Sequence, residues 1–318
     1  MKRRNFLKTT ALTGAAISTF PNYSKATTLT GKREHSLRIV QVTDMHIFPS
    51  EKVKAAISNL LEEIHDLQSK PDFVLNTGDA IMDSLSRSKK ETIEQWEAYK
   101  NYFLDPLQYK IYCCIGNHDV WGWKLHETAL EQDPDYGKNM AMKYLELDQR
   151  YYSFNAGDWH IICLDSTFKP EGEFDYIARL DDEQFSWLEN DLQNTPENTP
   201  VLIVSHIPVL SASVFFDGDN EKNGNWQVPG QWMHIDARRI KDLLFRHPNV
   251  KAAVCGHVHL VDAVNYLGLS YFTNGAVSGA WWKGAYQEFS PAYAIIDLYA
   301  DGSVDCELRE YNLTNARK

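Results

Sequence analysis

The chain contains 318 residues, of which 43% are hydrophobic and 24% are charged, and this composition is typical of a globular protein with one large or two small domains. Its formal net charge of −11 argues against nucleic acid as a partner, because nucleic-acid-binding proteins carry basic patches. The charge would also repel an anionic substrate weakly at long range, unless bound divalent cations reverse the local field.

The N-terminus carries the pattern of a targeting segment. Arg3-Arg4-Asn5-Phe6-Leu7-Lys8 resembles the bacterial twin-arginine export signal, although Lys2 stands where a polar residue is usual. The apolar stretch Thr9–Phe20 is too short and too polar to span a bilayer, and Ser24-Lys25-Ala26 offers small residues for a cleavage site. We therefore expect residues 1–26 to be a twin-arginine signal, read by the twin-arginine export machinery, and a periplasmic protein without a stable membrane anchor. The alternative is a frayed basic terminus.

Apolar runs and helical spacings alternate through the first half of the chain. Leu37–Val42 predicts a first strand, and Ser50 is placed to cap a helix that runs to about Leu67. After a strand that ends at Asn76, a second helix is expected at about Glu91–Phe103. This alternation predicts a largely parallel sheet.

The middle of the chain begins with a less regular excursion from Val120 to Gln149, in which we expect a short helix around Met140–Leu147. Tyr151–Asn155 and Trp159–Leu164 predict a β-hairpin. Asp181 and Gln184 resemble a capping box that opens a helix at Glu183–Leu192.

A long loop, Ile207–Asp236, separates the middle of the chain from its last third. Loops of this length in compact domains are usually functional. A helix is expected at Ala237–His247. Beyond it, Tyr271-Phe272, Ala292–Leu298 and Val304–Leu308 predict antiparallel strands.

Five short polar clusters each stand at the end of an apolar, β-branched run. They are Asp44-Met45-His46, Gly78-Asp79, Gly116-Asn117-His118-Asp119, His206 and Gly256-His257-Val258-His259. Ligands of open α/β sheets bind beyond the carboxyl ends of the strands, so clusters far apart in sequence are expected to meet in one place. Together they supply the oxygen and nitrogen donors of a transition-metal site.

In this order the clusters resemble the calcineurin-like metallophosphoesterase family, whose pattern is D-x-H, G-D, G-N-H-[DE], a lone His and G-H-x-H. Every block is present between Leu37 and His259, and five ordered blocks are far more specific than a single motif. The resemblance implies one domain, expected at residues 37–312. It also implies an α/β (α+β) fold: a four-layer α/β/β/α sandwich of two mixed β-sheets flanked by helices.

The resemblance further implies two divalent metal ions, with Fe, Mn or Zn as the expected elements. By the family pattern, the ligands of the first ion are Asp44, His46, Asp79 and His259, and those of the second are Asp79, Asn117, His206 and His257. Asp79 would bridge the two. Any one of these residues alone is more often a turn, cap or structural residue, and the conjunction of the five clusters favours the metal site.

The two expected metals and the adjacent His118 indicate how such a site would act on a phosphate ester. Two metals lower the pKa of a bridging water, so a hydroxide is available near neutral pH to attack phosphorus in line. The leaving alkoxide then needs a proton, and His118 is the candidate general acid, with Asp119 orienting it and favouring its charged form. The alternative for His118 is a purely structural role behind the ligands.

Substrate contacts are expected from Asn117, from His118 and from aromatic side chains at the mouth of the site. Trp121 is the first of these aromatic candidates, since an indole can stack on a base or sugar, and Trp123, Trp281 and Trp282 share the possibility. Packing under loops is the equally weighted alternative.

Two departures from the patterns of well-known subfamilies narrow the set of relatives that the chain resembles. Met82 stands where purple acid phosphatases carry a tyrosine, and the segment after Asp79 lacks the arginine of calcineurin-type protein phosphatases. The remaining match is to bacterial phosphodiesterases and phosphomonoesterases, including the cyclic-AMP phosphodiesterase type. We therefore expect dinuclear metal-dependent hydrolysis of small phosphomonoesters or phosphodiesters. A 3′,5′-cyclic-nucleotide phosphodiesterase is one alternative, and a non-catalytic metal- or phosphate-binding protein is another. The oligomeric state is left open.

Five cysteines complete the inventory, an odd number. Four of them lie in apolar runs: Cys113, Cys114, Cys163 and Cys255. Disulfides are conceivable in an exported protein. Twin-arginine cargo, however, typically folds before export in a reducing compartment, so buried free thiols are expected. Adjacent Cys113 and Cys114 should point to opposite faces of a strand.

Overall fold

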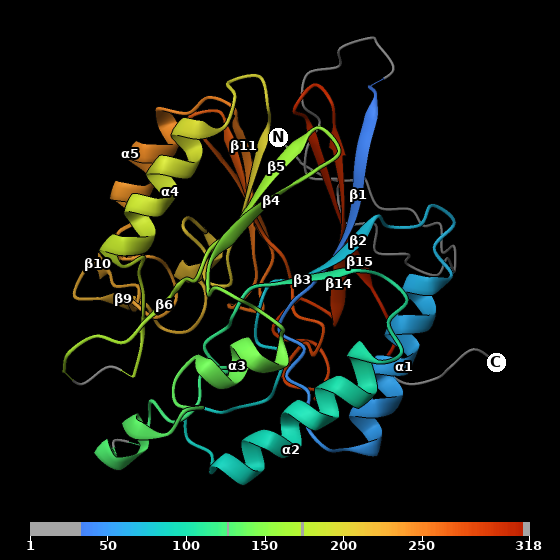
Figure 1. Ribbon diagram of the computed structural model, residues 1–318, viewed down its shortest axis with the longest axis vertical. Coiled ribbons are helices and arrows are strands. Elements are labelled where there is room, and N and C mark those ends of the chain that lie inside the picture. The colour runs from blue at the N-terminus through green and yellow to red at the C-terminus, as the bar shows by residue number, and fades with distance from the viewer. Residues whose placement is uncertain (1–32, 126, 173–174, 314–318) are drawn as a thin grey trace, which may run out of the picture.

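Two mixed β-sheets lie face to face in the computed structural model, and helices cover the outer face of each (Figure 1). The structure describes residues 33–125, 127–172 and 175–313, so the expected signal at 1–26 lies outside the described residues. The four-layer α/β/β/α sandwich predicted from the sequence is confirmed.

The elements have the following bounds. The first sheet contains β1 (His35–Val42), β2 (Phe73–Asn76), β3 (Ile111–Cys113), β14 (Ala292–Tyr299) and β15 (Val304–Glu310). The second contains β4 (Tyr152–Ala156), β5 (Trp159–Cys163), β8 (Val201–Val204), β11 (Val250–Cys255), β12 (Asp262–Tyr266) and β13 (Leu269–Thr273). The helices are α1 (Glu51–His65), α2 (Lys89–Tyr99) with a π-helical continuation at Lys100–Leu104, α3 (Asn139–Tyr144), α4 (Asp182–Asn194) and α5 (Ala237–Phe245). Two short strand pairs are β6 (Thr167–Phe168) with β7 (Ile177–Ala178) and β9 (Glu221–Lys222) with β10 (Asn225–Trp226).

Each large sheet combines a block of parallel strands with antiparallel strands. The first has the order β15-β14-β1-β2-β3, in which β1, β2 and β3 run parallel. The second has the order β12-β13-β11-β8-β5-β4, with β5, β8, β11 and β13 parallel. Tyr271-Phe272 lies in β13, which is antiparallel to β12 on one side and parallel to β11 on the other. The expectation of an antiparallel strand is therefore wrong for its pairing with β11.

Three apolar layers hold the sandwich together. Along β1, Val40 and Val42 face α1 and α2, whereas Leu37 and Ile39 face the second sheet, as the period of two in a strand requires. The layer between the sheets continues through Ile161 of β5 and through β8 and β11, and a third layer lies under α4 and α5. Burial on both faces explains why the central strands read as nearly continuous apolar runs.

The helix ends agree with the sequence signals only in part. Ser50 precedes α1 in extended conformation, but its side chain makes no capping hydrogen bond. Asp181 does cap α4, where it accepts a hydrogen bond from the Gln184 backbone N at 2.8 Å. The Gln184 side chain turns instead to the backbone of Asp165, so the expected box is half formed. A complete capping box opens α2 at Ser88.

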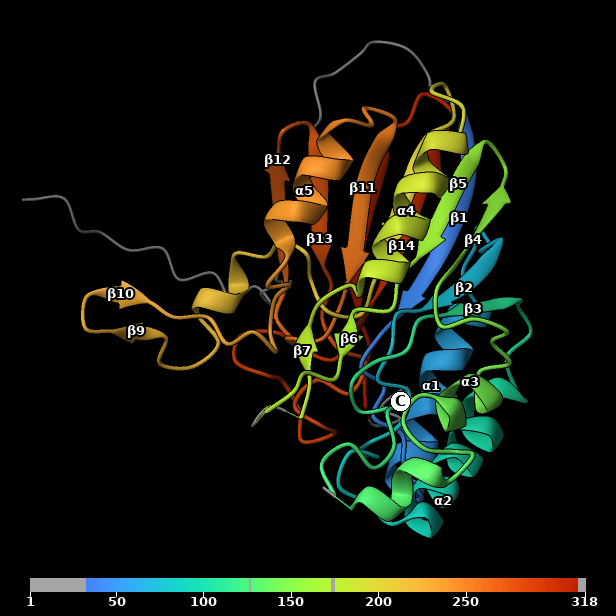
Figure 2. The same ribbon diagram turned by 60° about the vertical axis from the view of Figure 1, so that its left-hand side comes forward.

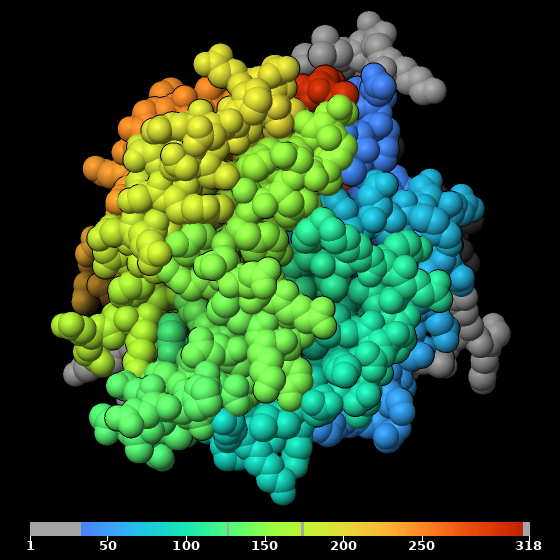
Figure 3. Space-filling model, in the orientation of Figure 1, coloured from blue at the N-terminus to red at the C-terminus, as the bar shows by residue number. Residues whose placement is uncertain are grey.

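The long loop after β8 is partly ordered into a hairpin. Figure 2 shows β9 and β10 projecting from the body of the molecule. Phe216 and Trp226 in this region are 68% and 56% exposed. The space-filling view shows the α2–α3 region meeting the β4–β5 region on one face of the molecule (Figure 3).

The cysteines are free thiols, as expected. Cys113 packs in the layer under α1 and α2, whereas Cys114 packs between the two sheets, so the pair does point to opposite faces. Within the described residues, no helix combines the length and apolar composition of a membrane span.

Candidate metal centre

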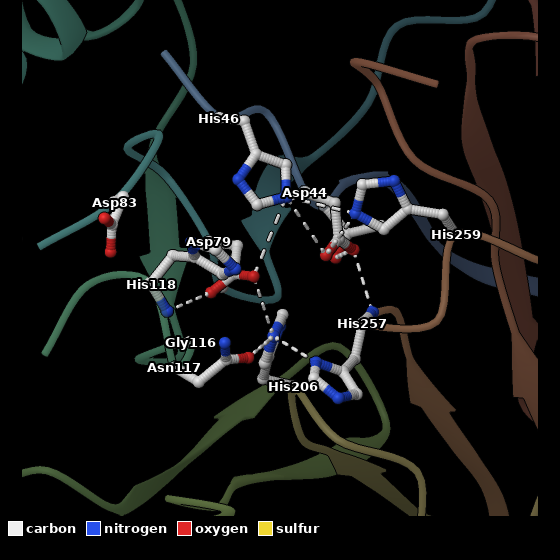
Figure 4. Close-up of polar contacts among 12 residues, drawn as sticks. Asp44, His46, Asp79, Asp83, Gly116, Asn117, His118, His206, His257 and His259 are labelled. Carbon is white, nitrogen blue, oxygen red and sulfur yellow. Dashed lines mark hydrogen bonds and ion pairs between the residues drawn. The ribbon is translucent and has the colours of Figure 1, made fainter. Parts of the chain in front are cut away.

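All five polar clusters lie beyond the carboxyl ends of parallel strands, where the two sheets meet. The first sheet delivers Asp44 and His46 after β1, Asp79 after β2 and Asn117 after β3. The second sheet delivers its three histidines after β8 and β11: His206, His257 and His259. Figure 4 shows the seven side chains turned toward one another. The structure thus brings together every residue that the sequence analysis assigns as a metal ligand.

Four of these residues form a first group. His259 Nε2 lies 3.4 Å from Asp44 Oδ1 and 3.0 Å from His46 Nε2. His46 Nε2 in turn lies 3.8 Å from Asp79 Oδ2. Every one of these side chains is buried.

A second group adjoins the first through the same carboxylate. His206 Nε2 lies 3.3 Å from Asp79 Oδ2 and 3.0 Å from Asn117 Oδ1. His257 Nδ1 lies 3.1 Å from His206 Nε2. Oδ2 of Asp79 is therefore close to the donor atoms of both groups, which is the position a bridging ligand must occupy.

Backbone carbonyls fix the tautomers of three of the histidines. His259 Nδ1 lies 2.6 Å from Gly279 O, and His206 Nδ1 lies 3.0 Å from Thr77 O. His257 Nε2 lies 3.0 Å from Gln231 O. Because a carbonyl oxygen only accepts, each of these nitrogens donates its hydrogen, and in the neutral imidazole the other ring nitrogen presents its lone pair to the cluster.

The donor set fits two divalent cations. Asp44 Oδ1 is buried among the ligands and has no hydrogen-bond partner in the described structure. His46 and His259 bring two ring nitrogens to 3.0 Å, an arrangement that a shared cation stabilises. Imidazole nitrogens with carboxylate and amide oxygens, and no thiolate, are suited to divalent transition metals.

The protonation states point the same way. Burial lowers the pKa of His46 to about 3 and that of His257 to about 3, which keeps both imidazoles in the neutral form that ligates metals. At His206 burial acts in the same sense and is the largest single effect, but the carboxylates of Asp79, Asp44 and Asp119 together outweigh it and raise the pKa to about 9. A cation that binds near Asp79 must therefore displace a proton from His206.

The backbone is strained at the ligands. Asp44, His46, Asp79, His257 and His259 have φ values of 51°, 45°, 53°, 75° and 58°. Left-handed conformations are uncommon outside glycine, cost about 1–3 kcal/mol each and concentrate at functional sites. They persist here because the loops brace each other, with the backbone N of Asp44 donating to Gly78 O and that of His46 donating to Asp79 O, both at 3.0 Å.

Two motif glycines are required by close approach to the carboxylates. A Cβ atom at Gly116 would collide with the Asp79 side chain. One at Gly256 would collide with the side chains of Thr43 and Asp44. The glycines of the third and fifth clusters thus make room for the ligands of the first and second.

His118 borders the centre, but Asp119 does not act on it as expected. The backbone N of His118 donates to Asp79 Oδ1 at 2.8 Å, its ring meets that of His46 edge-on at 4.8 Å, and its Nδ1 is buried without a partner among the described residues. Asp119 accepts hydrogen bonds from the backbone of Gly116 at 2.9 Å and of Ile81 at 3.2 Å. Both carboxylate oxygens are thus engaged by loop amides, so Asp119 fixes the loops rather than the imidazole. Burial, and then the Asp79 charge, raise the pKa of Asp119 to about 7.

Trp121 lies in the core, which corrects its expected place in substrate binding. It is 1% exposed, and its indole N–H donates to Arg87 O at 3.1 Å. Trp123 and Trp282 are buried as well. Trp281 alone of the four is half-buried, and it stacks on His259 with ring centroids 4.5 Å apart.

Several contacts to the centre come from residues that no motif marks. Tyr176, which precedes β7, places its ring edge-on to His257 at 6.4 Å. Gly279 and Gln231 accept hydrogen bonds from ligand imidazoles through backbone oxygens. A backbone acceptor leaves no residue-type signal in a sequence, and the tyrosine reaches the site only through tertiary packing.

The shared position of Asp79 leads to a testable expectation about metal content. Asp79→Asn should lower the occupancy of both metals, because it removes the one carboxylate that reaches both groups of donors. Elemental analysis after reconstitution measures this directly. Asp83→Asn is the matched control, since the Asp83 carboxylate accepts hydrogen bonds from Leu85 and Ser86, pairs with Arg87 and lies apart from the ligands in Figure 4. Wild-type metal content in Asp79→Asn would rule out the bridging role.

Comparison with known proteins agrees with this geometry. The family model described as calcineurin-like phosphoesterase matches residues 37–261. The 3′,5′-cyclic adenosine monophosphate phosphodiesterase CpdA of Vibrio vulnificus is 24% identical over 290 residues, which are 87% of this chain and 90% of that protein. The probable glycerophosphodiester phosphodiesterase GpdQ of Arcobacter nitrofigilis is 28% identical over 237 residues, 70% of this chain and 72% of that protein.

Among solved structures, a dimetal phosphatase from Danio rerio shares the fold, with a TM-score of 0.59 at 14% identity over 88% of this chain and 100% of that one. The family model spans well over half of the sequence and includes all five clusters. The chain therefore belongs to the calcineurin-like phosphoesterase family and is a hydrolase of phosphate esters.

Proposed function

We propose that the protein is a phosphodiesterase that acts on small-molecule phosphodiesters at a centre of two divalent cations, with Fe, Mn or Zn as the metals. The observation that carries the proposal is the Asp79 carboxylate, which lies within 3.8 Å of His46 Nε2 in one donor group and 3.3 Å of His206 Nε2 in the other. The preference for diesters rests on the relatives, whose names specify a cyclic nucleotide and glycerophosphodiesters as substrates. A cyclic nucleotide is the second candidate substrate, supported by the name of the Vibrio vulnificus relative.

The protein's own residues prepare the reaction by holding donors in place and by excluding water. Two bound divalent cations would supply Lewis acidity toward the phosphoryl oxygens and a lowered pKa for a nucleophilic water. Asp79 and the carbonyl-anchored imidazoles are held by the fold before any ligand arrives, so little reorganisation is needed. Their burial strengthens every electrostatic interaction with a phosphate in the site.

His118 is the residue placed to deliver a proton to the leaving oxygen. It is tethered by its backbone N to Asp79 Oδ1, and it shares a donor cluster with His46 and Asp79. Its Nδ1 makes no hydrogen bond to any described residue. An imidazole with an uncommitted ring nitrogen at the edge of the centre is suited to general acid catalysis.

Two kinds of leaving group test the function and the acid together. The metal-loaded wild-type protein should hydrolyse bis(4-nitrophenyl) phosphate, whose nitrophenolate leaves without a proton, and glycerophosphoethanolamine, whose alkoxide needs one. His118→Ala should slow the alkyl diester by about 10²–10⁴ and the nitrophenyl diester far less. Rates are measured by nitrophenolate absorbance and by enzymatic detection of released alcohol.

Metal content and a second histidine serve as controls for this experiment. His247→Ala, two residues beyond the end of α5, should leave both rates unchanged. Equal losses with both substrates, at normal metal content in His118→Ala, would show that His118 stabilises phosphoryl charge and donates no proton. A wild-type protein that hydrolyses phosphomonoesters and neither diester would contradict the proposed substrate class.

We further propose that the protein is exported to the periplasm by the twin-arginine machinery. The proposal is supported by Arg3 and Arg4 in the pattern R-R-x-F-L-K and by the free thiols, which suit folding before export.

Export is tested by changing only the paired arginines. Replacing Arg3 and Arg4 by Lys should retain the protein in the cytosol, because the signal is read by its arginines and not by its charge alone. Fractionation of cells followed by activity measurement locates the protein, and Lys8→Arg serves as the conservative control. Normal periplasmic recovery of the double variant would refute this route.

A further inference from the structure

We propose that Trp281 and Tyr286 form a subsite for a flat, unsaturated ring carried by the phosphate ester, such as an aryl or nucleobase group. The inference rests on the proposed function and adds the residues that select part of the substrate. Both residues belong to the segment between β13 and β14, which lies outside all five sequence clusters.

The indole of Trp281 lies directly against the first group of donors. Its ring is stacked on that of His259, with centroids 4.5 Å apart and planes 30° apart, and it lies 5.9 Å from the ring of His46. The side chain is only half-buried. An ester group on a phosphate held by these donors must therefore pass close to the indole, and an aromatic ring there gains stacking energy that an alkyl group does not.

The segment that carries Trp281 is anchored to the metal ligands on both sides. Trp282 is buried, and its indole N–H donates to His46 O at 2.9 Å. Gly279 O accepts the hydrogen of His259 Nδ1 at 2.6 Å. Trp281 and Trp282 have φ values of 48° and 67°. Bulky residues adopt this conformation where the surroundings impose it, which is a feature of functional sites.

Tyr286 forms a second wall at right angles to the first. Its ring meets that of Trp281 edge-on, with centroids 5.5 Å apart and an interplanar angle of 85°, and lies 5.7 Å from the ring of His259. Its hydroxyl donates to Asp217 Oδ1 at 2.6 Å, which ties this corner to the long loop after β8. Trp281 is stacked on His259, and Tyr286 is hydrogen-bonded to the loop after β8. The two rings therefore form a preformed aromatic corner beside the donors.

The hydrogen bonding of the tryptophans separates Trp281 from residues that only pack. The indole N–H groups of Trp121 and Trp282 donate to backbone carbonyls. That of Trp281 has no protein partner in the part of the chain that the structure describes, and it is not enclosed. A half-buried indole with an uncommitted N–H, set against the imidazoles of two proposed metal ligands, is placed to contact substrate.

Two phosphonates that cannot be hydrolysed test the subsite through binding alone. Calorimetry on the metal-loaded protein compares phenylphosphonate with methylphosphonate, which differ only in the flat ring. The wild-type protein should bind phenylphosphonate about tenfold more tightly, within the range of stacking on an aromatic side chain. Trp281→Ala should abolish this difference while leaving the affinity for methylphosphonate within about twofold, and Trp281→Phe should retain part of it.

The control is another half-buried tryptophan. Trp187 of α4 packs against the ring of Tyr151 at 4.9 Å, away from the donor groups, and Trp187→Ala should keep the full preference for the phenyl ligand. A preference that persists in Trp281→Ala, or that is lost equally in Trp187→Ala, would overturn the subsite. If the metal-loaded wild-type protein hydrolyses bis(4-nitrophenyl) phosphate but shows no preference for phenylphosphonate, the subsite is overturned and the proposed function stands.

Discussion

The carboxylate of Asp79 imposes the constraint on which the rest of this structure depends. It is buried with Asp44 and the imidazoles of His46, His206 and His259 at the junction of two sheets, and charges in such a place are costly unless they are paired. Without a cation, the burial cost is met by a proton, since Asp79 together with Asp44 and Asp119 overcomes the effect of burial and raises the pKa of His206 to about 9. Two divalent cations satisfy the same carboxylate and free the imidazole lone pairs, so the fold is built to be completed by metal.

The strand ends explain how seven ligands from five separate stretches reach this point. Three parallel strands of the first sheet and two of the second end at the same edge, and the apolar layer between the sheets fixes the two edges together. The sequence predicts this much because buried parallel strands leave strong apolar runs, and because Asp, Asn and His at their ends have few structural reasons to recur. The four-layer fold and the meeting of the ligands follow from those two signals.

Other features leave no comparable signal. Asp119 is adjacent in sequence to His118, yet both its oxygens serve backbone amides across the cluster, which depends on how the loops fold. The sequence does not distinguish Trp121 from Trp281 as a candidate for substrate contact. Packing buries Trp121 in the core, whereas Trp281 is half-buried and stacks on the ligand His259. β13 runs parallel to β11 because the strand between them in sequence, β12, runs in the opposite direction, and the apolar pattern of the sequence does not specify this. In each case a tertiary contact, and no local propensity, determines the outcome.

The most direct test of the account is a crystal structure of the protein loaded with a single transition metal, with the ions located by anomalous scattering. The account predicts two peaks on opposite sides of the Asp79 carboxylate. One should lie within coordination distance of Asp44, His46 and His259, and the other within coordination distance of Asn117, His206 and His257. Zn–N and Zn–O bonds of about 2.0–2.2 Å are the expected distances for zinc. A single peak, or two peaks of which one has no contact with Asp79, would contradict it.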